Sequence, residues 1–440
     1  ALRRRTMLSR EVALSPADVE RIAGNVSKLG GYALGLVEHF DLGVDRELFQ
    51  HHLKRTQDHV RTMAGSAGSV LVDLRPKGFS NQALLEATEL VWNYPQDLRF
   101  AAGSCMMSRM YARWMSEDNL KRALVAKVLY ACQEGILDDV IDKGPSGYLE
   151  AKDLYHLVLS SMTDPSLNPN AFMKRLMGGL GQDQLDLFET IVTIALHFNR
   201  LFHDSPHGSR LFYEMEKLEE RAALGQALTM FQKEATLDLP KLASIARSFH
   251  APDRSLTWYE RLASYIGGAA RLNLIDAAFV DRKLRAGKLK TLLKGWTLYD
   301  TVIILLNTVG GIHQDLRDGL ANLSLVAMRE KELRPLHSLK GFKPELTLED
   351  YRSHIVRLAG IASRGLEIVS PAYTDPHQYF PFSAVMLPVV LLADWIGKND
   401  EMIHAYIEAA APSIRKVAES APRPRTPLAE GKRKRNRARG

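Results

Sequence analysis

The run "DNLKRALVAKVLYACQEGIL" (residues 118–137), followed directly by "DDVIDKG" (138–144), decides the fold class of this chain. Its apolar residues recur every three to four positions, which is the period of a helix. The same period returns along most of the chain, and almost no segment alternates with the period of two that a half-buried strand requires. The sequence therefore predicts an all-α protein. Other segments with the helical period are residues 15–40, 183–202, 211–235 and 347–369.

Three aspartates, Asp138, Asp139 and Asp142, follow this apolar run at the expected end of its helix. Like charges placed together repel one another unless a positive group meets them. Asp138 and Asp142 are four residues apart and therefore share one helix face. Mg²⁺ prefers oxygen ligands and is usually bound by one or two carboxylates together with substrate phosphates. The cluster is a candidate metal site, and a solvent-exposed polar helix end is the alternative.

The composition is that of an ordinary soluble globular protein, because 46% of the 440 residues are hydrophobic and 25% are charged. The two cysteines, Cys105 and Cys132, lie in apolar helical surroundings and are expected to be buried thiols in a reducing compartment. No apolar run reaches the roughly 18 residues that a membrane helix needs. Residues 1–15 lack the apolar middle of a signal peptide. We therefore expect no membrane span and a cytoplasmic location.

The net charge of +7 belongs to one end of the chain. Residues 421–440 contain eight Lys/Arg and one Glu, so the other 420 residues carry no net charge. A segment this rich in Pro, Arg and Lys cannot bury a core and is expected to be a disordered basic tail. We expect no nucleic-acid partner, although "KRKRNRAR" (432–439) is also compatible with a nuclear address or with contact to RNA or an anionic membrane.

The stretch "LDDVIDKGPSGYLEAKDLYHLVL" (137–159) resembles the aspartate-rich helix of class I terpene synthases. In that family a DDxxD motif ends a helix, and a short glycine-containing turn leads to the next helix; Gly144 and Gly147 fill that turn here. The resemblance covers residues 100–410 approximately and implies a helical bundle with an active-site cavity at its centre. It implies an N-terminal helical extension (1–50), a class I terpene-synthase-like α domain (51–420) and the basic tail (421–440).

The family carries a second metal motif on a facing helix, for which "HQDLRDGLAN" (313–322) is the best candidate. Gln314, Asp318 and Asn322 are spaced as i, i+4 and i+8, which predicts one helical stripe of oxygen donors. The chain departs from the family pattern at all three of these ligand positions. A second register uses Asn322 and Glu330 instead. The resemblance implies the metal ligands Asp138, Asp139, Asp142, Gln314, Asp318 and Asn322.

The segment "ASYIGGAARLNLID" (263–276) is similar to the kinked helix that carries a diphosphate-sensing arginine in the family. Arg271 lies 43 residues before Gln314, and Gly267 and Gly268 fit the break in the helix. The terminal Arg-Tyr pair of many bacterial members is missing here. Basic residues that could replace it lie around Lys283, Arg285 and Lys290.

The resemblance implies a Mg²⁺-dependent cyclase that ionises an allylic prenyl diphosphate, with farnesyl diphosphate as the default substrate. The implied product is a sesquiterpene hydrocarbon, with a humulene- or germacrene-type macrocycle as one option, and pyrophosphate is released. Three Mg²⁺ ions are implied, Mn²⁺ being a substitute, and Asp138, Asp139 and Arg271 are the implied catalytic residues. The chain would act as a monomer or homodimer. The expected substrate-binding residues are Tyr130, Phe198, Trp258 and Arg271, with Tyr259, Phe380 and Trp395 as further aromatic candidates.

Three alternatives stay open at this point. A chain-elongating prenyltransferase resembles this chain in its first motif but needs a second DDxxD, which residues 313–322 lack. A squalene- or phytoene-type synthase would show two DxxxD-like motifs; Asp138 and Asp142 fit one, and we assign no match to the second. A non-enzymatic helical scaffold would use the basic tail to hold its partner.

Overall fold

The computed structural model describes residues 16–73, 95–143, 182–230, 238–282, 284–318, 322–339, 341–372 and 379–420. Throughout these ranges the regular structure is helical and contains no strand, which confirms the all-α prediction. The longer helices are α2 (Pro16–His39), α3 (Arg46–Asp73), α5 (Pro95–Tyr111), α6 (Glu117–Lys143), α9 (Gln182–His203), α10 (Gly208–Met230), α11 (Leu239–Ser248), α12 (Trp258–Ile266), α13 (Ala269–Phe279), α14 (Ala286–Asp318), α15 (Leu323–Leu333), α16 (Leu348–Val369), α17 (Tyr379–Leu391) and α18 (Asp400–Ser420). The 3₁₀ turns are η1 (Ala112–Trp114), η3 (Ser370–Ala372) and η4 (Ala393–Trp395).

Helix α6 begins after Ser116, whose Oγ accepts a hydrogen bond from the backbone N–H of Asn119. Such a side chain satisfies one of the N–H groups that have no partner inside the helix. Every residue from 123 to 130 is buried, so this part of α6 is covered on all sides by other helices. An all-round apolar helix is the kind that lies inside a protein, which explains the long apolar run in the sequence.

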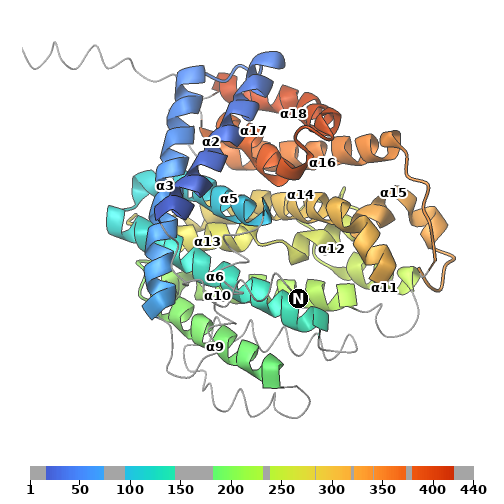
Figure 1. The fold of residues 1–440 in the computed structure, drawn as a ribbon, viewed down its shortest axis with the longest axis horizontal. Helices are drawn as coiled ribbons and strands as arrows, with labels where there is room; N and C mark the ends of the chain where they lie inside the picture. Colours follow the sequence, from blue (N-terminus) through green and yellow to red (C-terminus); the bar gives the residue numbers. More distant parts are fainter. Residues whose placement is uncertain are drawn as a thin grey trace, which may run out of the picture.

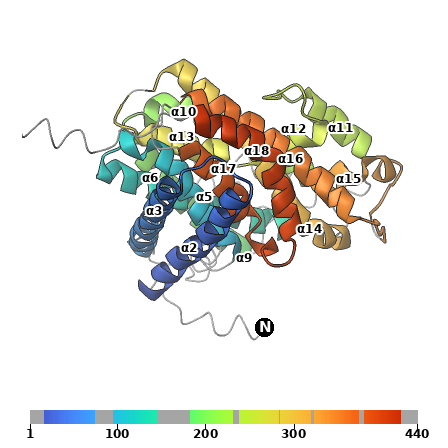
Figure 2. The same cartoon turned by 90° about the horizontal axis from the view of Figure 1, so that it is seen from above.

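Helix α14 is the longest helix of the described chain, with 33 residues, and it crosses the middle of the molecule. It packs against α16 on one side and against α12 and α13 on the other, and α18 packs on the far side of α16 (Figure 1). Helices α2 and α3 form an antiparallel pair at one side of the molecule, as the view from above makes clear (Figure 2).

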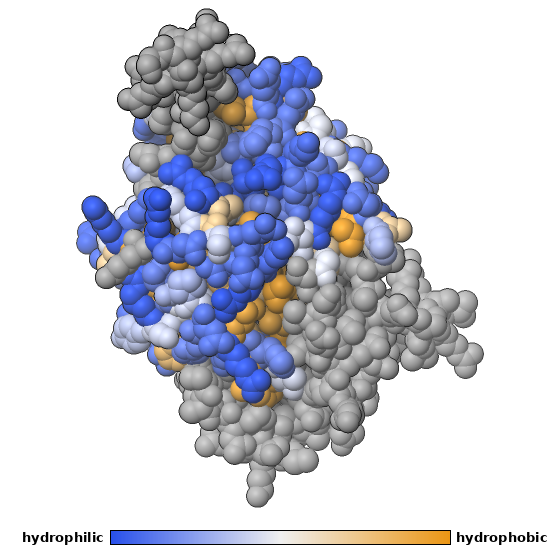
Figure 3. Space-filling model, turned by 90° about the vertical axis from the view of Figure 1, so that its left-hand side faces the viewer, coloured by the Kyte–Doolittle hydropathy of each residue, from blue (hydrophilic) through white to orange (hydrophobic). Residues whose placement is uncertain are grey.

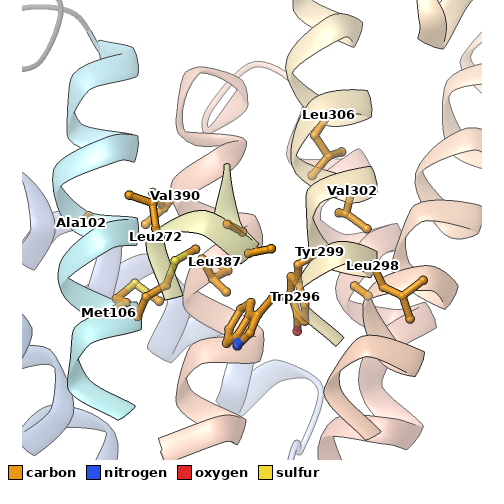
Figure 4. Close-up of a cluster of buried hydrophobic side chains, with 14 of the residues drawn as sticks. Ala102, Met106, Leu272, Trp296, Leu298, Tyr299, Val302, Leu306, Leu387 and Val390 are labelled. Carbon is orange, nitrogen blue, oxygen red and sulfur yellow. The ribbon is translucent and has the colours of Figure 1, made fainter. Parts of the chain in front are cut away.

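One continuous hydrophobic core joins the described helices. Between α5, α13, α14 and α17 it contains Met106, Leu272, Trp296 and Leu387, which point toward one another (Figure 4). The N-terminal helices belong to the same core. The expected domain boundary at residue 50 falls inside α3, where Phe49 packs against Phe382 of α17 with ring centroids 4.9 Å apart.

The outer faces of the helices are mainly polar. On the face drawn in Figure 3, hydrophilic side chains dominate the coloured surface, and hydrophobic ones show in narrow gaps between them. Cys105 and Cys132 are both buried and form no disulfide, which confirms the prediction of buried thiols. Within the described ranges, no helix is both long enough and apolar enough to span a bilayer.

Candidate active site

A helix break between α12 and α13 organises the site. Helix α12 stops at Ile266, and Gly267 has the extended backbone angles φ −61° and ψ 155°. Asp300 of α14 lies against the break, where its carboxylate accepts hydrogen bonds from the backbone N–H groups of Ala269 and Ala270. These two N–H groups open α13 and have no partner inside that helix. The sequence-based expectation of a break at Gly267–Gly268 is confirmed.

Arg271, the third residue of α13, is 2% exposed and makes four hydrogen bonds. Its Nη1 donates to Glu134 of α6 at 3.0 Å and to Glu219 of α10 at 3.2 Å. Its Nη2 donates to the backbone carbonyls of Ile266 and Gly267. The break thus leaves two backbone carbonyls that accept hydrogen bonds from the guanidinium. Through its four hydrogen bonds Arg271 connects α6, α10 and the end of α12 to α13.

Burial is the largest single influence on the pKa values of Arg271 and of its acidic neighbours Glu219 and Asp300. It raises the pKa of Glu219 to about 7, although the nearby Arg271 charge acts in the opposite direction. It also raises the pKa of Asp300 to about 7, against the effects of Arg271 and of the two backbone N–H groups. Burial alone lowers the pKa of Arg271, but Glu134 and the other acidic neighbours outweigh it, so the pKa of Arg271 rises and the guanidinium stays charged.

A cavity of about 420 Å³ lies beside this cluster. This volume falls within the range of roughly 300–1,000 Å³ that is usual for small-molecule sites. Helices α5, α13, α14 and α17 supply an apolar wall, and the polar lining residues come from α5, α6, α10, α13 and α14. The apolar wall contains Phe100, Met107, Leu272, Ile303, Ile304, Leu387, Val390 and Leu391. The polar lining residues are Ser104, Tyr130, Glu134, Gln226, Arg271 and Asn307.

The lining residues of α6 lead directly toward the aspartate cluster. Tyr130 and Glu134 line the cavity, and the Tyr130 hydroxyl donates to Glu134 at 3.0 Å. Helix α6 continues to Lys143, so Asp138 lies one turn beyond Glu134 on the same face of the helix. One turn is about 5–6 Å along the axis. The side chains of Asp138, Asp139 and Asp142 lie outside the described ones, so their roles remain predictions.

Helix α14 passes the same cavity and carries two of the predicted ligands of the second motif. Asn307 lines the cavity, and Gln314 and Asp318 follow it at spacings of seven and eleven residues, which keeps the three near one helix face. The Gln314 side chain is exposed and accepts a hydrogen bond from Arg317. Asp318 is the last residue of α14, and its side chain lies outside the described ones.

The predicted stripe of three ligands is wrong in its last member. Helix α14 ends at Asp318, and Asn322 starts α15 as its N-terminal cap. The Asn322 Oδ1 accepts from the N–H of Leu325, and its Nδ2 donates to the Thr308 carbonyl and to Asp315. Asparagine competes well for the N-cap position because its short side chain can bond a free helix N–H.

In the alternative register of the second motif, one of the two proposed ligands also has hydrogen-bond partners within the protein. Its second member, Glu330, accepts hydrogen bonds from Trp258 and from Arg334, both at 3.0 Å. Among the residues with described side chains, no group of three or more His, Cys, Asp or Glu could hold a metal. The aspartates at the end of α6, whose side chains lie outside the described ones, therefore stay the predicted metal ligands.

Of the aromatic residues predicted to bind substrate, Tyr130 lines the cavity and the others are not among its described lining residues. Tyr130 lines the cavity, and its ring also faces the Arg271 guanidinium at 5.3 Å. Phe198 lies behind it, with the two ring centroids 5.9 Å apart, and is buried in the core. Trp258 is buried elsewhere, where its Nε1 bonds Glu330. Among the described lining residues of the cavity there is no Tyr259, Phe380 or Trp395.

Sequence reasoning missed the three acidic residues that surround Arg271. Glu134 carried a usable signal, because it precedes Asp138 by one helical turn. Glu219 and Asp300 carried none, since they come from helices far away in the sequence. A fully buried ion pair between Lys127 of α6 and Asp276 of α13, close behind the cavity wall at Ser104, was missed for the same reason.

Two of the three basic residues named as replacements for the missing Arg-Tyr pair lie away from the described lining of the cavity. Arg285 and Lys290 are exposed near the start of α14, and neither lines the cavity. Lys283 and the basic tail at 421–440 lie outside the described residues.

In comparisons with known proteins, no protein-family model matched the chain, and no curated protein matched it either.

Proposed function

We propose that this protein is a Mg²⁺-dependent class I terpene cyclase acting on an allylic prenyl diphosphate, with farnesyl diphosphate as the first substrate to test. The observation that carries the proposal is the register of α6. Its cavity-lining residues Tyr130 and Glu134 are followed one turn later by Asp138 and Asp139. If the carboxylates of this cluster face the cavity, they would add a metal-binding end to an apolar pocket, as a substrate with an apolar chain and a diphosphate requires.

The starts of α6 and α14 support the same arrangement. Asp281, shortly before α14, accepts hydrogen bonds from the backbone N–H of Ser116 and from the Asn119 side chain at the start of α6. The two helices therefore begin close together, and each then passes the cavity. Their C-terminal parts carry the aspartate cluster on one helix and Gln314 on the other.

The carboxylates fit the metal by the chemistry of the donor set, since Mg²⁺ takes hard oxygen ligands. Asp138 and Asp139 would hold it with Asp142, and Gln314 and Asp318 are the remaining candidates on α14. Bound Mg²⁺ would neutralise charge on the diphosphate as it leaves. Asn322 is excluded from this set because its side chain caps α15.

The residues of the cavity would act on the organic part of the substrate. The allylic C–O bond breaks and its electron pair leaves with the diphosphate, which forms an allylic carbocation. A double bond of the same chain then attacks this cation and closes the ring, giving a sesquiterpene hydrocarbon once a proton passes to the released pyrophosphate. The apolar wall formed by Leu272 and Leu387 excludes water that would trap the cation as an alcohol.

Arg271 and Tyr130 would contribute the electrostatic part of this mechanism. Arg271 is a fixed positive charge at the polar end of the cavity, where a preorganised cation stabilises a leaving anion. Arg271 also donates hydrogen bonds to Glu134 and Glu219, so diphosphate binding would compete with these carboxylates. The Tyr130 ring presents an aromatic face that can stabilise a cation in the cavity.

The test is to incubate the purified chain with geranyl, farnesyl or geranylgeranyl diphosphate and Mg²⁺, with and without EDTA, and to analyse the organic extract. A cyclic hydrocarbon that disappears with EDTA would support the proposal, and the preferred substrate would give the chain length. Longer linear prenyl diphosphates or head-to-head products would favour the prenyltransferase or squalene-type alternatives. The absence of both pyrophosphate and hydrocarbon with all three substrates would refute it.

A further inference from the structure

A second hollow, the basic groove, lies between α10, residues 250–254 and the first three turns of α14, with a volume of about 1050 Å³. It shares no lining residue with the cavity described above. Its charged lining residues are Glu214, Lys217, Arg221, Asp253, Arg254, Lys290 and Lys294, which give a net charge of +3. The chain up to residue 420 has no net charge, so this groove is a local concentration of positive charge.

Both acidic residues of the basic groove already have partners. Glu214 Oε1 lies 3.6 Å from Lys217 Nζ. Asp253 Oδ2 lies 3.5 Å from Arg364 Nε, and its Oδ1 accepts the backbone N–H of Ser255. The carboxylates therefore leave most of the positive charge of the groove uncompensated.

Four cations of the basic groove form no ion pair with any described carboxylate, namely Arg221, Arg254, Lys290 and Lys294. The Arg221 guanidinium is held over the Tyr265 ring at 5.7 Å, which fixes its position. Lys290 and Lys294 are spaced i, i+4 on α14, and like charges at this spacing destabilise a helix. A negatively charged ligand would remove this repulsion.

Beside its cations, the basic groove has an apolar part of its lining, which we call the leucine floor. Leu218, Leu289 and Leu293 line it from α10 and α14. Positive side chains around a concave surface with low-dielectric walls focus the electric field and concentrate anions there. A concave site of this kind suits a small anion with an organic body better than it suits a flat membrane surface.

We propose that the basic groove binds an organic phosphate, with a diphosphate or triphosphate group on Arg221, Arg254, Lys290 and Lys294 and the organic body on the leucine floor. The site is separate from the proposed cyclase cavity and does not depend on that activity. A nucleotide is the ligand of this kind that we test, and inorganic pyrophosphate, which shares its phosphate chemistry but lacks the organic body, is the comparison.

The test uses the full chain in EDTA, so that a metal-dependent diphosphate site is silent. Binding of pyrophosphate, ATP and adenosine is measured by titration calorimetry for the wild type and for Lys290→Glu/Lys294→Glu. The control, Lys28→Glu/Lys398→Glu, makes the same charge change at two exposed lysines outside the groove. Circular dichroism confirms that both variants fold.

We expect saturable binding of ATP or pyrophosphate that weakens at least tenfold in the groove variant, is unchanged in the control and falls with added salt. Tighter binding of ATP than of pyrophosphate would place the organic body on the leucine floor, and adenosine alone should not bind measurably. No saturable binding to the wild type, equal loss in both variants, or full binding by the groove variant would each overturn the proposal.

Discussion

Glu134 Oε1 lies 3.0 Å from Arg271 Nη1, although the two residues are 137 positions apart in the sequence. This contact joins the helix that carries the aspartate cluster to the helix break that carries the arginine. Both residues also line the cavity. The proposed leaving-group site is thus built around an internal ion pair, which a substrate diphosphate would have to rearrange.

The first prediction concerns the aspartates at the end of α6. Asp138→Asn/Asp139→Asn removes two carboxylates, so the rate of farnesyl diphosphate cyclisation should fall by more than about 100-fold. Mutation of residues that only hydrogen-bond to metal ligands already lowers metal affinity or activity by roughly 10–100-fold. The measurement is product formation by gas chromatography at saturating Mg²⁺. Asp41→Asn/Asp45→Asn, on the loop before α3, is the control. Wild-type turnover in the double variant would exclude a metal role for this cluster.

The second prediction concerns the close approach of Gly267 to Asp300. A Cβ at Gly267 would lie 2.4 Å from Asp300 Cβ, whereas one at Gly268 would meet nothing nearer than Arg271 Nη2 at 3.8 Å. Gly267→Ala should therefore lower the free energy of unfolding by about 1–3 kcal/mol through overpacking. Gly268→Ala should change it far less. Urea denaturation of both variants checks this, and equal stabilities would contradict the packing argument.

The third prediction concerns the buried pair of Lys127 and Asp276, whose side chains are both 0% exposed. Lys127→Met leaves Asp276 without its cation, and removing one partner of a buried pair costs about 3–5 kcal/mol. The double variant Lys127→Met/Asp276→Leu should recover most of that loss. Lys121→Met, which breaks the exposed pair with Glu117, should have a small effect. Denaturant titration of the three variants measures their free energies of unfolding and tests the predicted order of the losses.

The fourth prediction concerns pH and Glu219. Its pKa in the folded protein is about 7, above the roughly 4.3 of an unfolded glutamate. Between these values the folded state binds more protons than the unfolded state, so this group makes stability fall as pH rises, by up to about 1.4 kcal/mol per pH unit. Glu219→Gln should therefore gain stability relative to the wild type from pH 4.5 to 7. A constant difference across that range would show that Glu219 has an ordinary pKa.

The fifth prediction concerns the basic tail. Deleting residues 421–440 should leave cyclase activity unchanged, because a segment this rich in Pro, Arg and Lys is expected to form a tail outside the helical domain. The measurement is the kcat/KM for farnesyl diphosphate of the full and truncated chains. Loss of activity on truncation would instead favour a protein whose function depends on the tail.

Local sequence patterns were good guides where the relevant interactions are short in range. The period of α6 predicted a buried helix, and Gly267–Gly268 predicted a break before Arg271. The helical period of residues 347–369 is confirmed by α16, which begins with a capping box in which the Asp350 carboxylate accepts the Thr347 N–H. The stripe that includes Asn322 failed, because spacing alone does not reveal whether an asparagine continues a helix or caps the next one.

By itself, the sequence determined the all-α class, the buried thiols and the helix break, because helical periodicity, side-chain polarity and glycine act over a few residues. Only the tertiary structure decided which charges meet. Arg271 forms ion pairs with Glu134 and Glu219, and Lys127 forms one with Asp276. Asp300 caps α13, and each of these contacts joins helices distant in the chain. Buried charges need partners at hydrogen-bonding distance, and the packing of whole helices, which no local pattern encodes, selects those partners.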